Sequence, residues 1–278
     1  MTYSTTAIDE QSFSAEQSRP RRRPTDITLL VSAATIVVIL GLWAFAAAFQ
    51  LVSPVFLPSP VAVLRSSYAL ATVGFVDSTL AEHVFASLFR IFGALALAIV
   101  LGVPAGLAMA MSRIGKGILD PIVEFLRPLP PLAYLPLIII WCGIGETSKI
   151  VVIALAMLPP IIISTVSGVR STSKDHINAA RSFGANRWQL LTQVVLPSTT
   201  PSILTGIRIA LGAGWSTLVA AELIAAPQGL GFMIQSAAQF LVTDIVIAGI
   251  FTIALIAFMF EMLARLLERT LTPWTAHK

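Results

Sequence analysis

The sequence predicts an all-α polytopic membrane protein with six transmembrane helices and both termini in the cytoplasm. The 278 residues are 56% hydrophobic and only 12% charged, whereas a soluble domain is typically about 25% charged. The apolar residues fall into long runs, and most Lys and Arg residues lie in the segments between alternate runs. About 20 apolar residues cross a bilayer, and cationic loops stay on the cytoplasmic side.

Residues 1–26 are polar, contain RPRRRP at positions 19–24 and are expected to form a disordered cytoplasmic tail. The apolar run 27–49 is longer than the roughly 7–15 residues of a signal-peptide core and has no clear small-residue cleavage site. We therefore expect it to be the first membrane span. Three prolines interrupt the connecting region 50–80, in which residues 61–73 are expected to form one surface helix.

The second span is expected at residues 83–111, and an irregular third span at 118–141. Five prolines fall in the latter segment. They cannot all lie in a regular helix, because proline lacks an N–H donor and clashes with the preceding turn. We expect an interfacial helix up to Leu126, a break at 127–131 and a span ending at Trp141. Such a break is tolerated in a membrane only where protein or a water-filled cavity satisfies the backbone.

The remaining spans are expected at residues 149–169, 203–226 and 244–266, and the first of these contains a Pro-Pro pair that predicts a kink. Residues 228–243 are expected outside, with a short re-entrant or surface helix. The predicted domains are therefore the tail 1–26, a transmembrane domain 27–268 and a cytoplasmic tail 269–278.

The net charge of +4 is explained by membrane orientation, because the positive residues flank apolar runs, and not by binding to nucleic acid. The one cysteine, Cys142, excludes a disulfide within the chain.

The stretch NAARSFGANRWQLLTQVVLP, residues 178–197, lies in the most cationic gap between apolar runs. It predicts two short amphipathic helices within residues 173–197. Ser173 or Asp175 can cap the first helix, and Gly184 can end it in the left-handed conformation.

Asn186 and Gln189 form a capping-box pattern at the start of the second helix. Pro197 is expected to stop that helix. A compact amphipathic hairpin at the membrane surface is either an ordinary connection or a docking element for another protein.

No sequence motif indicates an active site. The chain has no GxxxxGK[ST], HExxH or GxSxG pattern and no Cys/His cluster. We therefore expect no catalytic residue, no metal site and no nucleotide bound by this chain.

Ionisable residues within spans are the next signal, because a central charge costs roughly 2.5–3.5 kcal/mol. Arg90 and Glu222 lie in the outer parts of their spans. Arg90 can reach the outer interface, and Glu222 can cap the turn at 228–231 or pair with Arg90. Glu124 and Arg127, three apart on a helix, can neutralise each other. Alternatively, some of these residues line a path through the membrane.

Trp215, Ser216 and Thr217 follow Gly212 and Gly214 in the fifth span. The glycines allow close helix packing, and helix packing is one interpretation of the whole segment. In the other, the indole and the two hydroxyls make weak contacts with a small solute. The expected path residues are Glu124, Arg127, Trp215, Ser216, Thr217 and Glu222.

The hairpin also resembles the coupling motif of ABC-importer permeases: Glu-Ala-Ala, three residues, Gly, nine residues, Ile, one residue, Leu-Pro. Asn178 stands where the motif has Glu, and Val194 replaces Ile. The lost carboxylate removes any ionic contact from that position but not the helix–Gly–helix shape. The expected coupling residues are Ala179, Ala180, Arg181, Gly184, Arg187, Val194, Leu196 and Pro197.

From residue 53 to 274 the chain looks like the taurine-transporter permease branch of the binding-protein-dependent family. The segments that carry this are SPVFLPSP, SLFRIFGALAL, GILDPIVEFLRPLPPLAYLPLIIIWCGIGETSKI, GWSTLVAAELIAAPQGLGFMIQSA and LTPW. Permeases for alkanesulfonates, nitrate and other small anions share much of the pattern.

The resemblance implies the type I ABC-importer permease fold in the bacterial inner membrane. It also implies a homodimer of this subunit, two ATPase subunits that bind ATP and Mg, and a periplasmic binding protein. That protein is expected to dock on external loops, including residues 143–147 and 228–243. Two other classes are an ion-coupled secondary transporter using Glu222 and a membrane scaffold without transport.

Overall fold

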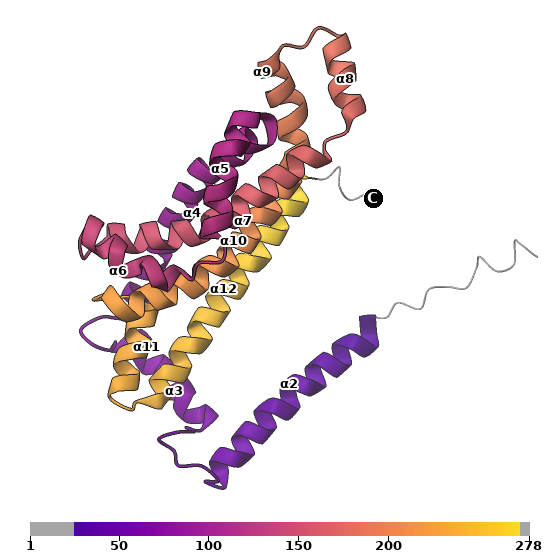
Figure 1. The fold of residues 1–278 in the computed structure, drawn as a ribbon. Helices are drawn as coiled ribbons and strands as arrows, with labels where there is room; N and C mark the ends of the chain where they lie inside the picture. Colours follow the sequence, from indigo (N-terminus) through magenta and orange to yellow (C-terminus); the bar gives the residue numbers. More distant parts are fainter. Residues whose placement is uncertain (1–24, 273–278) are drawn as a thin grey trace, which may run out of the picture. The chain divides into compact units, whose positions relative to one another are not determined.

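The computed structural model describes residues 25–272, and within that range all regular elements are helices (Figure 1). The predicted N-terminal tail lies outside the described residues up to position 24, as does the LTPW segment from Pro273 onward. The helices are α2 (Thr25–Ala48), α3 (Pro60–Thr72), α4 (Leu80–Met111), α5 (Arg113–Leu126), α6 (Pro131–Cys142), α7 (Glu146–Ser171), α8 (Lys174–Ser182), α9 (Arg187–Gln189), the π-helix η1 (Leu190–Val195), α10 (Leu196–Ala225), α11 (Leu230–Gln239) and α12 (Thr243–Leu271).

Five described helices are long and apolar enough to cross a membrane: α2, α4, α7, the continuous segment from α9 through α10, and α12. The α5–α6 pair supplies a sixth crossing if the two bent helices count as one. The predicted all-α membrane fold is confirmed in this form. Among the described residues, α2 and the chain that follows it to Val52 form one compact unit, and the residues from Ser53 to Thr272 form the other.

The predicted helix up to Leu126 and the predicted break at 127–131 are confirmed, because α5 ends at Leu126 and α6 begins at Pro131; only the expectation that the segment after the break spans the membrane by itself is wrong. The axes of α5 and α6 differ by 109°. The α6 helix has 12 residues, so it is about 18 Å long and does not by itself cross a core of roughly 30 Å. Pro128, Pro130 and Pro131 impose the bend, because consecutive residues without N–H donors cannot continue the helix.

The core of the larger unit forms where α7 packs between α4 and α10. Glycines allow these helices to approach closely. A Cβ atom added at Gly106 of α4 would lie 2.6 Å from the Cβ atom of Thr165 on α7, and one added at Gly168 would lie 2.7 Å from Ser202 on α10. The middle helix of the core thus contacts one neighbour on each side through positions that tolerate no side chain.

An ion pair ties α12 to this core at its C-terminal end. The Arg208 guanidinium on α10 lies 2.7 Å from the Glu268 carboxylate, which also accepts a hydrogen bond from the Thr205 hydroxyl at 2.9 Å. Within the larger unit, α8 and α9 project beyond one end of the helices, whereas α3 and α11 lie at the other end (Figure 1). The two ends therefore present separate surfaces.

The close approach of α4 and α7 predicts that Gly106→Ala destabilises the protein. Overpacking of this kind costs about 1–3 kcal/mol, which exceeds the helix propensity that alanine adds over glycine, about 1 kcal/mol. The matched control is Gly117→Ala in α5, where an added Cβ meets nothing within 4 Å. We expect the thermal unfolding midpoint in detergent to fall for Gly106→Ala and to stay level or rise for Gly117→Ala. Equal midpoints would contradict the packing.

Candidate functional site

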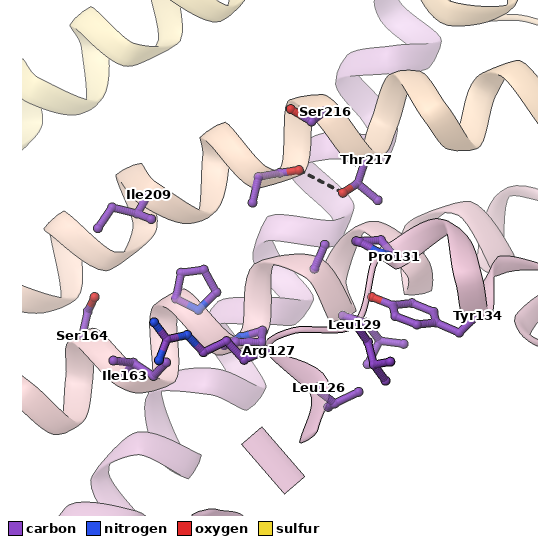
Figure 2. A pocket seen from close by; sticks show the side chains of 15 residues that line it. Leu126, Arg127, Leu129, Pro131, Tyr134, Ile163, Ser164, Ile209, Ser216 and Thr217 are labelled. Atoms are coloured by element: carbon purple, nitrogen blue, oxygen red, sulfur yellow. Dashed lines mark hydrogen bonds between the residues drawn. The ribbon is translucent and has the colours of Figure 1, made fainter. Parts of the chain in front are cut away.

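A cavity of about 560 Å³ lies among the α5–α6 break, the middle of α7 and α10. Figure 2 shows Arg127 on one wall of this central cavity and Ser216 and Thr217 on the helix across from it. The lining residues are Leu126, Arg127, Leu129, Pro131, Tyr134, Leu155, Ala156, Pro159, Pro160, Ile163, Ser164, Ile209, Ala213, Ser216 and Thr217.

The central cavity opens where the surrounding helices are irregular or carry small side chains. One wall is the proline break between α5 and α6, and a second contains Pro159 and Pro160 of α7. Ala156 and Ala213 add little volume on α7 and α10. The cavity is therefore apolar over most of its lining and polar at a few points, as small-molecule sites commonly are.

Arg127 contributes a positive charge without a protein counter-ion. No carboxylate of the described residues lies within 4.0 Å of its guanidinium. Its backbone N–H donates a hydrogen bond to the Val123 carbonyl. The predicted alternative, neutralisation by Glu124, does not occur at ion-pair distance. A guanidinium is planar and permanently charged, so an arginine that has no carboxylate partner is suited to binding an anionic ligand.

The hydroxyls predicted for the path face the central cavity from α10, with their protons already engaged. The Thr217 hydroxyl donates to the Ala213 carbonyl at 2.9 Å, and Ser216 donates to the Gly212 carbonyl at 3.4 Å. Each oxygen keeps acceptor capacity for a ligand donor. The contacts they offer are consequently weaker and less directional than those of Arg127.

A second, charged cavity of about 310 Å³ adjoins the first and shares Arg127 and Ile163 with it. Glu124 lines this cavity together with Asp120, Ser167 and Arg170. The structure thus places Glu124, Arg127, Ser216 and Thr217 around two spaces that have Arg127 in common.

Trp215 and Glu222 line neither cavity. Trp215 is buried in the core beside Phe260 of α12, with ring centroids 6.3 Å apart. The helix turns about 100° per residue, so Trp215 and Ser216 face different neighbours although they are adjacent in sequence.

Glu222 belongs instead to a buried polar cluster at the end of the larger unit where α11 lies, and Arg90 is its centre. The Arg90 side chain is 2% exposed and makes a bidentate pair with Glu146, at 2.6 and 2.8 Å. Its Nη1 group donates to Glu222 at 2.7 Å and to the Gln228 carbonyl at 2.7 Å. Lys149 lies 2.9 Å from Glu146, so two cations and two carboxylates balance in formal charge.

Glu222 also caps the N-terminus of α11. Its Oε2 atom accepts from the Gly231 N–H at 2.7 Å, and its Oε1 atom accepts from the Ser87 hydroxyl at 2.7 Å. The Leu230 N–H donates to the same Ser87 oxygen at 2.9 Å. A carboxylate at a helix N-terminus satisfies free N–H groups and complements the helix dipole. Both structural interpretations of Glu222, the pair with Arg90 and the turn cap, are therefore realised together.

His83 fixes the neighbouring loop through both ring nitrogens. The Gly229 N–H lies 3.1 Å from Nδ1, and the Phe75 carbonyl lies 3.2 Å from Nε2. Since an N–H can only donate and a carbonyl can only accept, this arrangement selects the neutral tautomer with its proton on Nε2.

In the hairpin at 173–197, the predicted helix caps and the predicted turn at Gly184 are present in the structure. The Ser173 hydroxyl accepts from the Asp175 N–H at 3.2 Å. Gly184 has φ +81°. Asn186 and Gln189 form a reciprocal capping box, with bonds of 2.8 and 2.9 Å.

The expectation that Pro197 stops the second helix is wrong. The chain continues from α9 through η1 into α10, and Pro197 lies in the first turn of α10. Proline is tolerated in a first turn because its missing N–H is not needed there. The wider turn of η1 takes up the change in hydrogen bonding, so the predicted fifth span begins earlier than residue 203.

Two aromatic side chains of the hairpin are largely exposed. Phe183 is 93% exposed and Trp188 is 70% exposed. Ala179 is also exposed, and Ala180 is half-buried. An apolar surface of this kind on a projecting hairpin is typical of a docking site.

Several residues of these sites were absent from the sequence predictions. Tyr134 and Ser164 line the central cavity, and Glu146 and Lys149 complete the Arg90 cluster. The spacing of Glu146 and Lys149, i and i+3 at the start of a span, was an available signal for an ion pair. Nothing local marks Tyr134 or Ser164, because which face of a helix meets a cavity depends on its neighbours.

Comparison with known proteins places these features in a family. The family described as "Binding-protein-dependent transport system inner membrane component" matches residues 98–273. The chain is 54% identical over 254 residues to the taurine transport system permease protein TauC of Escherichia coli (strain K12), covering 91% of this chain and 92% of that one. It is 37% identical over 236 residues to the putative aliphatic sulfonates transport permease protein SsuC of the same organism, covering 85% and 88%.

Among solved structures, the fold is similar to a chain of the MetNI methionine ABC transporter in an inward-facing conformation. The TM-score is 0.63 at 18% identity, and the match covers 69% of this chain and 96% of that chain. This likeness supports the arrangement of the helices alone.

The buried cluster predicts that Arg90→Leu strongly destabilises the protein, because Glu146 and Glu222 lose their shared cation. Removing one partner of a buried pair costs about 3–5 kcal/mol. The matched control is Arg265→Leu, whose side chain is 57% exposed and pairs with Glu261, and such surface pairs contribute about 0–1 kcal/mol. Thermal unfolding in detergent measures both variants. A second variant, Arg90→Leu with Glu222→Leu, is expected to recover part of the loss, and an Arg90→Leu protein as stable as Arg265→Leu would refute the role of the cluster.

Proposed function

This chain belongs to the family of inner membrane components of binding-protein-dependent transport systems, and we propose that it moves taurine or a closely related small sulfonate into the cytoplasm. It is the multi-pass permease subunit of an ABC importer. The observation that carries the substrate proposal is the unpaired Arg127 in the central cavity, together with the relatives that are named for taurine and aliphatic sulfonates.

The chemistry of the central cavity fits a small molecule that carries one anionic group. Arg127 supplies one fixed positive charge, and the apolar lining leaves few other strong contacts. A guanidinium holds a tetrahedral oxyanion through paired N–H groups. In this proposal Ser216 and Thr217 accept from donors of the substrate, Glu124 acts in the charged cavity, and Trp215 and Glu222 support the path from outside it.

We infer that the partners are a second copy of this chain, two ATPase subunits and a periplasmic binding protein. ATP and Mg would be bound by the ATPase. A second copy is supported by Leu223 and Ile224 near the end of α10, two apolar side chains that are exposed in the single chain and line neither cavity. Residues Gly143–Gly145 and Pro227–Gln228 are exposed or half-buried next to the Arg90 cluster and suit docking of the binding protein.

The route for coupling follows from the continuity of the chain. The hairpin leads through η1 directly into α10, and α10 forms one wall of the central cavity. A rigid displacement of the hairpin by the ATPase would therefore move Ala213, Ser216 and Thr217 relative to Arg127. The family resemblance of the hairpin assigns the contact with the ATPase to its exposed residues.

Two alternatives lead to different measurements. The same permease importing an alkanesulfonate, nitrate or another small anion would use the same arginine. An ion-coupled secondary transporter is disfavoured, because both oxygens of Glu222 are already bonded within the protein. Uptake that survives loss of ATP and fails without an ion gradient would favour it. A membrane scaffold without transport would be favoured if substitution of Glu222, of Arg127 and of the hairpin left every phenotype intact.

The substrate proposal is tested by uptake into vesicles that contain the permease, its ATPase and its binding protein. Taurine uptake is expected to depend on ATP and to fall about 10- to 100-fold in Arg127→Gln, the effect of losing a charge-assisted hydrogen bond. Arg113→Gln in the exposed first turn of α5 is the control and is expected to transport normally. Import of nitrate or an alkanesulfonate in place of taurine would leave the architecture intact and overturn the substrate.

The coupling proposal predicts that Gly184→Pro abolishes ATP-driven uptake. Proline holds φ near −65°, whereas Gly184 has φ +81° and donates its N–H to the Arg181 carbonyl at 2.9 Å. Gly184→Asn is the control, because asparagine tolerates the left-handed region and keeps the donor. ATP hydrolysis stimulated by the binding protein is measured for both. Normal coupling in Gly184→Pro would show that the hairpin turn does not transmit the motion.

A further inference from the structure

Ala156 lines the central cavity, and its carbonyl group can receive neither an α-helical nor a 3₁₀ hydrogen bond, for a covalent reason. In an α-helix the carbonyl of residue i accepts from the N–H of residue i+4, and in a 3₁₀ turn from residue i+3. For Ala156 these two donors would come from Pro160 and Pro159, and neither has an N–H. Leu155 differs, because its i+3 residue is Leu158 and can donate.

Ala156 and Pro160 are half-buried on the cavity side of α7, whereas Pro159 is buried. No side-chain hydroxyl, amide or amine of the described residues donates to the Ala156 carbonyl; the hydroxyl nearest in sequence, that of Thr165, donates to Ile161 at 2.8 Å. The oxygen lies near the middle of α7, halfway between its ends at Glu146 and Ser171. Broken backbone hydrogen bonding inside a membrane occurs where a protein or aqueous cavity can satisfy the free group.

The cavity also contains donors that lack protein acceptors. Arg127 has no carboxylate partner, and the Tyr134 hydroxyl makes no hydrogen bond with the described residues. Figure 2 shows both side chains on the wall formed by the α5–α6 break. One cavity therefore presents free donors on one wall and a backbone acceptor on another.

We propose that the Ala156 carbonyl is the binding site for the ammonium group of a zwitterionic substrate whose anionic end is held by Arg127. This rests on the function proposed above and deepens it from a sulfonate to an aminosulfonate. An ammonium group needs acceptors and gains from a carbonyl dipole in a cavity with little water. A sulfonate or inorganic anion without an amine gains nothing from that oxygen, so the Pro-Pro pair of α7 sets the preference for the zwitterion.

The test compares binding of taurine and of ethanesulfonate, which has the same carbon chain and sulfonate but no amine. The permease–ATPase complex in lipid nanodiscs is titrated with each by calorimetry. The binding protein is left out, because its own selectivity would mask that of the cavity. In the wild type we expect taurine to bind about tenfold or more tightly than ethanesulfonate, the effect of one hydrogen bond to a charged group.

Pro160→Ala supplies an N–H to the Ala156 carbonyl and is expected to reduce that ratio to about twofold or less, with ethanesulfonate affinity unchanged. Pro159→Ala is the matched control. The N–H that it restores at residue 159 donates to the Leu155 carbonyl in an α-helix, so the ratio of taurine to ethanesulfonate affinity should stay as in the wild type. Arg127→Gln is expected to weaken both ligands equally.

A wild-type ratio near one, or an equal ratio in Pro160→Ala and the wild type, would overturn the ammonium site. Either result leaves the proposed function intact if the complete system imports taurine. Absence of taurine import by the complete system, or binding of ethanesulfonate without taurine, would overturn the proposed function itself.

Discussion

The guanidinium of Arg90 is the interaction on which the α11 end of the larger unit depends. It donates four hydrogen bonds, two to Glu146 at the start of α7, one to Glu222 near the end of α10 and one to the Gln228 carbonyl in the following loop. Three elements distant in sequence are thereby fixed to α4. Because the group is buried and its charge is balanced by the cluster, any shift of one element would leave another charge uncompensated in a medium of low dielectric. The loops at 143–145 and 226–229 consequently have a defined position.

Irregular backbone creates the space between the two ends. The break between α5 and α6 and the Pro-Pro pair inside α7 both line the cavity, opposite the small side chain of Ala213 on α10. In a bilayer such interruptions leave polar groups that lipid cannot satisfy. Their cost is consistent with a cavity that receives a polar substrate, and the same prolines that disturb the helices leave a carbonyl available for it.

The opposite end is connected to this cavity by an unbroken helical path. The segment formed by α9, η1 and α10 runs continuously from residue 187 to 225, so motion at the exposed Trp188 has a direct mechanical route to the cavity wall. The close packing of α7 against α4 and α10 through Gly106 and Gly168 limits how much of that motion can be absorbed by deformation.

The sequence by itself determined the membrane class, the spans, the hairpin turn and the irregularity of residues 118–141, because hydrophobic length, capping residues and proline act locally. It also identified Arg127, Ser216 and Thr217 as polar groups in apolar surroundings. Only the tertiary structure decided that Glu222 pairs with Arg90, and that Trp215 enters the core while Ser216 meets the cavity, since these outcomes depend on which helices become neighbours. The continuation of the helix through Pro197 was likewise beyond a local rule, because it required η1 to change the register of hydrogen bonding ahead of the proline.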